Sequence, residues 1–299
     1  MIRLRATDVG SLNADVSLEG VSVFLDQFAL YKLATGNGPR RSRFTQAMRT
    51  GGDLIFSVAN AAELSGLTGK SFDAVKELLR DLGAKWFPIE MDPKAVSDRE
   101  ISGLNRADSF VSKKFVSDFT QDRFLKQPQG EVMLSERFFD LSWVMDWLGP
   151  QRDSVISTRK QLDEVLRERV LALRVKFETD ANWLDTAFPN VSYNAQIPGT
   201  FAYAHVMRGL IVEAKSHHLK KGDGIDFCQA VLASSIATVA TLDKHWKRRI
   251  EQLPKPNGLA RIYYASELDS MVEDFEARVK LRRALKGSAP EPPATNRPS

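Results

Sequence analysis

Cysteine is almost absent from this chain of 299 residues, which holds only Cys228. A single thiol excludes a disulfide framework and indicates a reducing compartment. No run of about 18 apolar residues occurs, so no membrane-spanning helix is predicted. The first 20 residues also lack the apolar segment of a secretory signal. We therefore expect a cytoplasmic protein without a membrane partner.

Glycine-rich phosphate loops are missing as well. No G-x-G-x-x-G motif follows a predicted strand, and the Gly-Asn-Gly run at 36–38 follows a predicted helix instead. This pattern disfavours a Rossmann-type nucleotide site. The excess of basic residues is small, 42 Lys and Arg against 38 Asp and Glu. A net charge of +4 permits a polyanionic partner but does not require one.

Short apolar runs alternate with helical patterns near both ends of the chain. The predicted strands are 21–25, 54–58, 85–89, 238–242 and 261–265. Alternation of strands and helices predicts an α/β domain with a parallel sheet flanked by helices.

Residues 94–215 break this alternation, because their apolar residues recur at spacings of three and four. We expect an all-helical insertion within one α/β domain that spans 21–285, with its core formed by 21–93 and 216–285. Residues 1–20 are expected to form an irregular N-terminal arm. The Pro-rich segment 286–299 is expected to be a disordered tail.

Acidic side chains stand where predicted strands end or helices begin. Asp26 and Asp243 directly follow strands, Glu63 lies early in a helix, and Asp223 and Asp226 precede the helix 227–236. The carboxyl ends of parallel strands form the ligand crevice of such sheets, so these acids are expected to converge. Clustered carboxylates repel each other unless a cation lies between them, and Mg²⁺ and Mn²⁺ prefer oxygen ligands.

Two of these acids also have a simpler interpretation. An acid near a helix start, such as Glu63, commonly interacts with the helix dipole. Asp223 fits either an auxiliary metal ligand or the N-cap of the helix that begins at Phe227, and we favour the cap.

Four segments in this order resemble the PIN-like nuclease family. They are FLDQFALYKL with Asp26, SVANAAELSG with Glu63, GDGIDFCQAVLAS with Asp226, and TVATLDKHW with Thr241 and Asp243. The resemblance covers roughly 21–93 and 216–265. Phe28 departs from it, because family members carry a small hydroxyl or amide residue at that position.

The resemblance implies a PIN-like fold and a metal-dependent endonuclease that hydrolyses phosphodiester bonds, with RNA as the expected substrate. Asp26, Glu63, Asp226 and Asp243 would be its catalytic, metal-binding acids, and Mg²⁺ or Mn²⁺ its cofactor. Asp26 and Asp243 would be direct ligands, whereas Glu63 and Asp226 would hold a second ion or orient its waters. The alternatives are a structure-specific DNA nuclease and a non-catalytic PIN-like scaffold. A homodimer and an inhibitory or regulatory protein partner remain open.

Basic residues flank the acids along the chain. Arg40 and Arg41 follow Asp26, while Lys221 and Lys244 lie next to the other acids. Such side chains are expected to hold the phosphates of a nucleic acid. The competing interpretation is a solvated surface.

Overall fold

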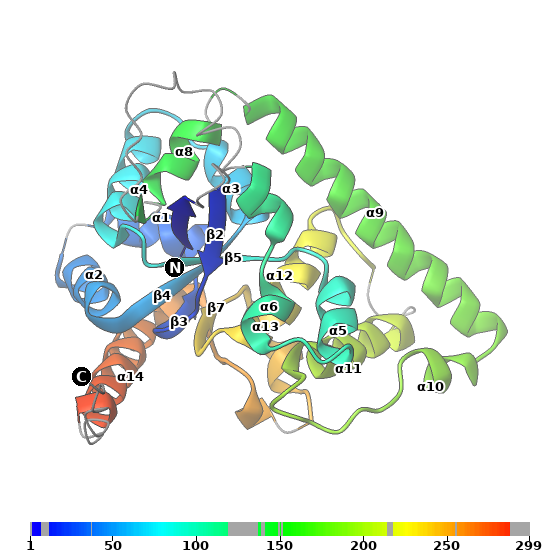
Figure 1. Ribbon diagram of the computed structural model, residues 1–299. Helices are drawn as coiled ribbons and strands as arrows, with labels where there is room; N and C mark the ends of the chain where they lie inside the picture. Colours follow the sequence, from blue (N-terminus) through cyan, green and yellow to red (C-terminus); the bar gives the residue numbers. More distant parts are fainter. Residues whose placement is uncertain are drawn as a thin grey trace.

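A parallel sheet of five strands, in the order β5-β4-β3-β7-β8, runs through the centre of the molecule (Figure 1). Its strands are β3 (Val21–Phe24), β4 (Gly52–Ser57), β5 (Trp86–Ile89), β7 (Val239–Thr241) and β8 (Arg261–Tyr263). The computed structural model describes residues 2–6, 12–36, 38–118, 137–138, 141–148, 150, 152–213, 218–254 and 256–287. The α/β class and the five predicted strands are confirmed.

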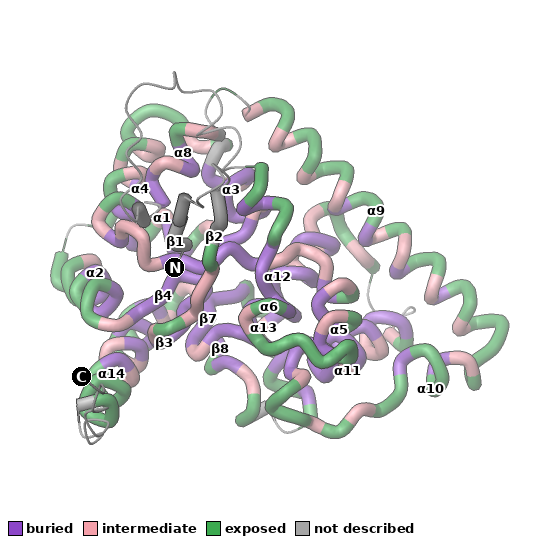
Figure 2. The backbone as a smooth tube through the Cα atoms, viewed as in Figure 1, coloured by how far each residue is buried: buried purple, intermediate pink, exposed green. Residues whose placement is uncertain are grey.

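Burial explains why these segments form strands. Every residue of β3, β4 and β5 is buried. Parallel sheets are covered on both faces, so their strands are apolar runs without polar alternation. Figure 2 shows this buried backbone at the centre of the molecule, along the strands and helix α12 (Asp223–Ile236).

The chain fills the two halves of the sheet in opposite directions. From β3 it moves outward to β4 and β5, and it later returns to β7 and β8 on the other side of β3. Parallel crossovers are right-handed, so the helices of the two halves cover opposite faces. The first half carries α1 (Gln27–Thr35), α2 (Pro39–Gly51), α3 (Val58–Ser65) and α4 (Gly69–Leu82). The second half carries α12 and α13 (Lys244–Glu251), and α14 (Leu268–Gly287) packs on α2.

The reversal of strand order lies between β3 and β7. These neighbours pair in parallel, with Phe24 opposite Ala240. The residues that follow the two strands therefore emerge side by side at the carboxyl edge of the sheet. Such a reversal is where open α/β sheets place their ligand crevice.

Helices fill most of the long segment between β5 and α12. They are α5 (Pro93–Ile101), α6 (Arg106–Phe110), α8 (Ser142–Leu148), α9 (Arg152–Thr179), α10 (Trp183–Ala187) and α11 (Pro198–Val212). Helix α9 runs along the periphery (Figure 1) and packs against α3, α11 and α12. None of the helices in the described ranges combines the length and apolar character of a bilayer span.

The N-terminal residues differ from the expected irregular arm. Strands β1 (Ile2–Ala6) and β2 (Leu12–Val16) form an antiparallel pair, and β1 also pairs with β6 (Arg137–Phe138). Residues 94–215 are therefore not entirely helical. Pairing of β1 with the distant β6 leaves no local pattern in the sequence. The expected tail beyond Gly287 lies outside the described residues.

A buried carboxylate of α9 holds the start of α12. Asp163 accepts hydrogen bonds from the backbone N–H groups of Gly222 at 2.9 Å and Gly224 at 3.0 Å. The predicted N-cap role of Asp223 is therefore wrong. Helix α12 begins at Asp223 itself, and a carboxylate from a distant helix satisfies its first donors.

A similar contact fixes the start of α11. Glu100 of α5 is buried and accepts from the backbone N–H groups of Gly199 at 3.0 Å and Thr200 at 2.6 Å. Both contacts place a negative charge at the positive end of a helix dipole. They hold the start of α11 against α5 and the start of α12 against α9.

Removing the Asp163 carboxylate tests this arrangement. We expect Asp163→Ala to lower the free energy of unfolding by about 2 kcal/mol, because backbone donors lose a charged acceptor. Urea denaturation followed by circular dichroism measures the change. Glu164→Ala is the matched control, because Glu164 is the exposed neighbour on α9. Equal losses in the two variants would contradict the capping role.

Candidate metal centre

Asp26 and Asp243 each follow a strand and begin a helix. Asp26 Oδ1 accepts from Ala29 N at 2.8 Å at the start of α1. Asp243 Oδ1 accepts from Trp246 N at 2.8 Å at the start of α13. Each cap uses one carboxylate oxygen, Oδ1, so Oδ2 takes no part in it. The structure thus places both acids at the edge that the sequence predicted.

Thr241 connects the two strand ends. Its hydroxyl accepts from Asp26 N at 2.8 Å and donates to Asp26 Oδ1 at 3.2 Å. These bonds fix the carboxylate of Asp26 against β7. Burial raises the pKa of Asp26, and the nearby charge of Asp243 raises it further. Opposing hydrogen bonds from Ala29 and Thr241 lower this pKa by a smaller amount.

Glu63 reaches the same place from α3. Asn60 Nδ2 at the start of α3 donates to Leu25 O at 3.3 Å, which ties the helix to the end of β3. The Glu63 side chain is only 8% exposed. Burial raises its pKa most, the positive charge of Arg159 lowers it, and the negative charge of Asp26 raises it.

Asp226 lies in the first turn of α12, whose later residues are all buried. Its pKa is raised to about 7, first by burial and then by the charges of Asp243, Glu63 and Asp223. Within the described ranges its carboxylate accepts no hydrogen bond. The mutual effects of these acids on each other's pKa values show that they share one electrostatic field. These four acids are near enough to affect each other's pKa values, and their convergence on one metal ion stays a prediction.

Arg159 of α9 is the residue that sequence reasoning missed. Its Nη2 donates to Glu63 Oε1 at 2.6 Å, so a side chain supplies one of the cations that the acids require. Its Nε is buried without an acceptor. The signal in the sequence was the spacing of Arg159 and Asp163, four residues apart on the helix face that Leu166 and Val170 bury.

Gln229 is a second polar group that the sequence did not single out. It extends from α12 beside Glu63, and a hydrogen bond from its side chain lowers the pKa of that carboxyl.

The donors of this crevice are all oxygens, as Mg²⁺ and Mn²⁺ prefer. Among the residues that the structure describes, however, no three His, Cys, Asp or Glu side chains are grouped closely enough to hold an ion. The helix caps hold one oxygen each of Asp26 and Asp243. Binding of a divalent ion by these acids stays a prediction.

Asp223 has a different partner from the other acids. Its Oδ2 accepts from Lys220 N at 2.5 Å, which fixes the turn before α12. It still acts on Asp226 through its charge. A role as an auxiliary ligand remains a prediction.

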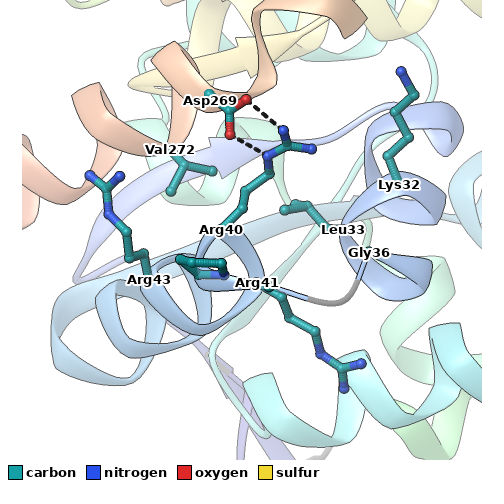
Figure 3. A pocket seen from close by; sticks show the side chains of 10 residues that line it. Lys32, Leu33, Gly36, Arg40, Arg41, Arg43, Asp269 and Val272 are labelled. Carbon is teal, nitrogen blue, oxygen red and sulfur yellow. Dashed lines mark hydrogen bonds and ion pairs between the residues drawn. The ribbon is translucent and has the colours of Figure 1, made fainter.

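The basic residues predicted to contact phosphates divide into two groups. Arg40 donates to both oxygens of Asp269, and Arg41 donates to Asp81 at 3.0 Å, so these arginines tie α2 to α14 and α4. Figure 3 shows their guanidinium groups pointing in different directions rather than into a shared cradle. Lys221 and Lys244 are exposed beside the acids. Their contact with phosphate stays a prediction.

Comparison of the chain with protein-family models, with curated proteins and with solved structures gave no match. Function is therefore inferred from the geometry and chemistry of these side chains.

The raised pKa of Asp226 predicts a pH-dependent stability. The folded protein keeps this proton up to about pH 7, whereas the unfolded chain releases it near pH 3.8. Stability therefore falls as the pH rises between these values, by up to about 1.4 kcal/mol per pH unit. In metal-free buffer, Asp226→Asn should gain stability relative to wild type across this interval. Parallel pH profiles from urea denaturation of the two proteins would contradict the prediction.

Proposed function

We propose that the protein is a divalent-metal-dependent endonuclease with a PIN-like fold, which hydrolyses phosphodiester bonds, most readily in RNA. One observation carries the proposal: Asp26 and Asp243 flank the reversal of strand order, and Glu63 and Asp226, which lie on two helices, are near enough to share charge effects with them. The strand order, with the first strand of the sheet at its centre, supports the PIN-like assignment. Residues 94–215 would be an insertion into that fold.

The side chains have distinct tasks in this proposal. Asp26 and Asp243 would hold the ion through the oxygens that do not cap the helices. Thr241 holds Asp26 in place for this contact. Bound Mg²⁺ or Mn²⁺ would supply an activated water and neutralise charge on the leaving oxygen.

Asp226 changes charge when the cation arrives. Without it, the carboxyl group is about half protonated near pH 7. A bound cation would favour the ionised form of Asp226, so metal binding would be coupled to release of its proton. Metal binding should therefore weaken below neutral pH.

The exposed lysines beside the acids support a nucleic-acid substrate. Lys244 follows Asp243 at the start of α13, and Lys221 precedes α12. Two exposed positive charges next to these acids in the chain would attract the phosphates of a nucleic acid.

A non-catalytic scaffold is the second candidate, and the Glu63–Arg159 ion pair favours it. This pair neutralises one acid without metal, so part of the cluster is stable as an internal structural contact. Titration with Mn²⁺ separates the two candidates. Binding in the millimolar range or tighter supports the nuclease, and its absence supports the scaffold.

Exchange of the strand-end acids for amides tests the nuclease directly. Asp26→Asn and Asp243→Asn should each reduce cleavage of single-stranded RNA and DNA in Mn²⁺ by about 100-fold or more, because a metal ligand loses its charge. The amide oxygen still caps the helix, so the folded structure should persist. The control is Asp185→Asn, which removes the surface partner of Arg208. Full activity in both strand-end variants would refute the mechanism.

A further inference from the structure

One aromatic ring lies open to solvent close to Asp26. Phe28 is the only exposed Phe, Tyr or Trp among the residues that the structure describes, with a relative exposure of 48%. It follows Asp26 by two positions, in the first turn of α1, and the Asp26 carboxylate caps this turn through Ala29 N. The backbone that carries the ring is therefore fixed at the carboxyl edge of the sheet.

The packing of α1 depends on another face of the helix. Its buried side chains are those of Ala29, Leu30, Leu33 and Ala34. Phe28 is not one of them, so a smaller side chain at position 28 would leave no internal cavity. The stability of the fold therefore gives little reason for an aromatic ring at this place.

Lys32 lies one turn further along α1 and contacts the ring. Its Nζ is 4.5 Å from the centroid of Phe28, which is the geometry of a cation–π interaction. Within the described ranges Lys32 forms no ion pair with an Asp or Glu side chain. Figure 3 shows the Lys32 side chain extending from α1, apart from the Arg40–Asp269 pair. Its charge therefore remains available to an anion from outside the protein.

An open aromatic face with a cation beside it matches the chemistry of single-stranded nucleic acid. Every base has a π-face that can stack on an aromatic side chain, while Lys and Arg hold the backbone phosphates. The bases of a duplex stack on one another, so the same ring would find no free base there. A single ring is also much smaller than the contiguous apolar patches that mark protein docking sites, which disfavours a protein partner.

We propose that Phe28 is a stacking platform for one base of a single-stranded nucleic acid, and that Lys32 contacts a phosphate beside that base. This inference rests on the nuclease function proposed above and specifies single strands as its substrate class. The ammonium of Lys32 occupies one face of the ring, and the exposed remainder receives the base. Because every base can stack, Phe28 favours unpaired strands without selecting a sequence.

Binding without metal tests the platform independently of cleavage. Fluorescence anisotropy with a labelled oligouridine RNA in EDTA should show that Phe28→Ala weakens binding by at least about fivefold, because one base loses its stacking surface. Phe28→Leu should weaken binding similarly, since an aliphatic side chain has no π-face, whereas Phe28→Trp should retain the affinity. Ile101→Ala is the matched control, because Ile101 is an exposed apolar residue on α5.

A blunt RNA duplex and a salt titration separate stacking from phosphate contact. The duplex should bind wild type and Phe28→Ala equally, because it offers no free base. With the single strand, Lys32→Gln should reduce the slope of log affinity against log salt concentration by about 0.7, the value for one phosphate contact. An unchanged slope would overturn the phosphate contact of Lys32.

The stacking role is overturned if folded Phe28→Ala or Phe28→Leu binds the single strand as tightly as wild type does. It is also overturned if Phe28→Ala weakens binding of the duplex as much as binding of the single strand. A wild-type protein that binds neither nucleic acid would instead overturn the nuclease function on which the inference rests.

Discussion

Repulsion among carboxylates at the ends of β3 and β7 is the constraint to which the rest of this structure responds. Parallel pairing of the two strands brings Asp26 and Asp243 to one edge, where burial removes much of the water around Asp26 while Asp243 stays exposed. Helix caps and Thr241 compensate part of the charge of Asp26. Arg159 compensates Glu63. Asp226 has no such partner among the described residues. Burial and the charges of the other acids therefore raise its pKa to about 7.

The helices between β5 and α12 do more than cover the sheet. Helix α9 supplies both the cation that faces Glu63 and, through Asp163, the acceptor that holds the start of α12. Charge compensation and helix placement therefore depend on one element. Glu100 has the equivalent role for α11, from α5. Carboxylates serve here in two ways, as caps where backbone donors surround them and as candidate ligands where donors are few.

The sequence predicted what local patterns determine. Buried parallel strands are apolar runs, so the sheet and the acids at its edge could be located before the structure was known. The role of Arg159 could not be predicted, because its partner Glu63 lies 96 positions away in the sequence. An arginine on a long polar helix usually faces solvent. The same reason explains why Asp223 was wrongly predicted to cap α12. The carboxylate that holds the start of this helix belongs to the distant Asp163. The ion pair of Arg40 could not be predicted either, because its partner Asp269 lies 229 positions away.

The nuclease proposal depends on whether a divalent cation binds among these acids. A crystal structure of the wild-type protein soaked in MnCl₂, with an anomalous difference map recorded near the manganese edge, locates it directly. A peak within about 2.5 Å of oxygens from Asp26 and Asp243 is the expected result. A map without a peak at these acids would contradict it.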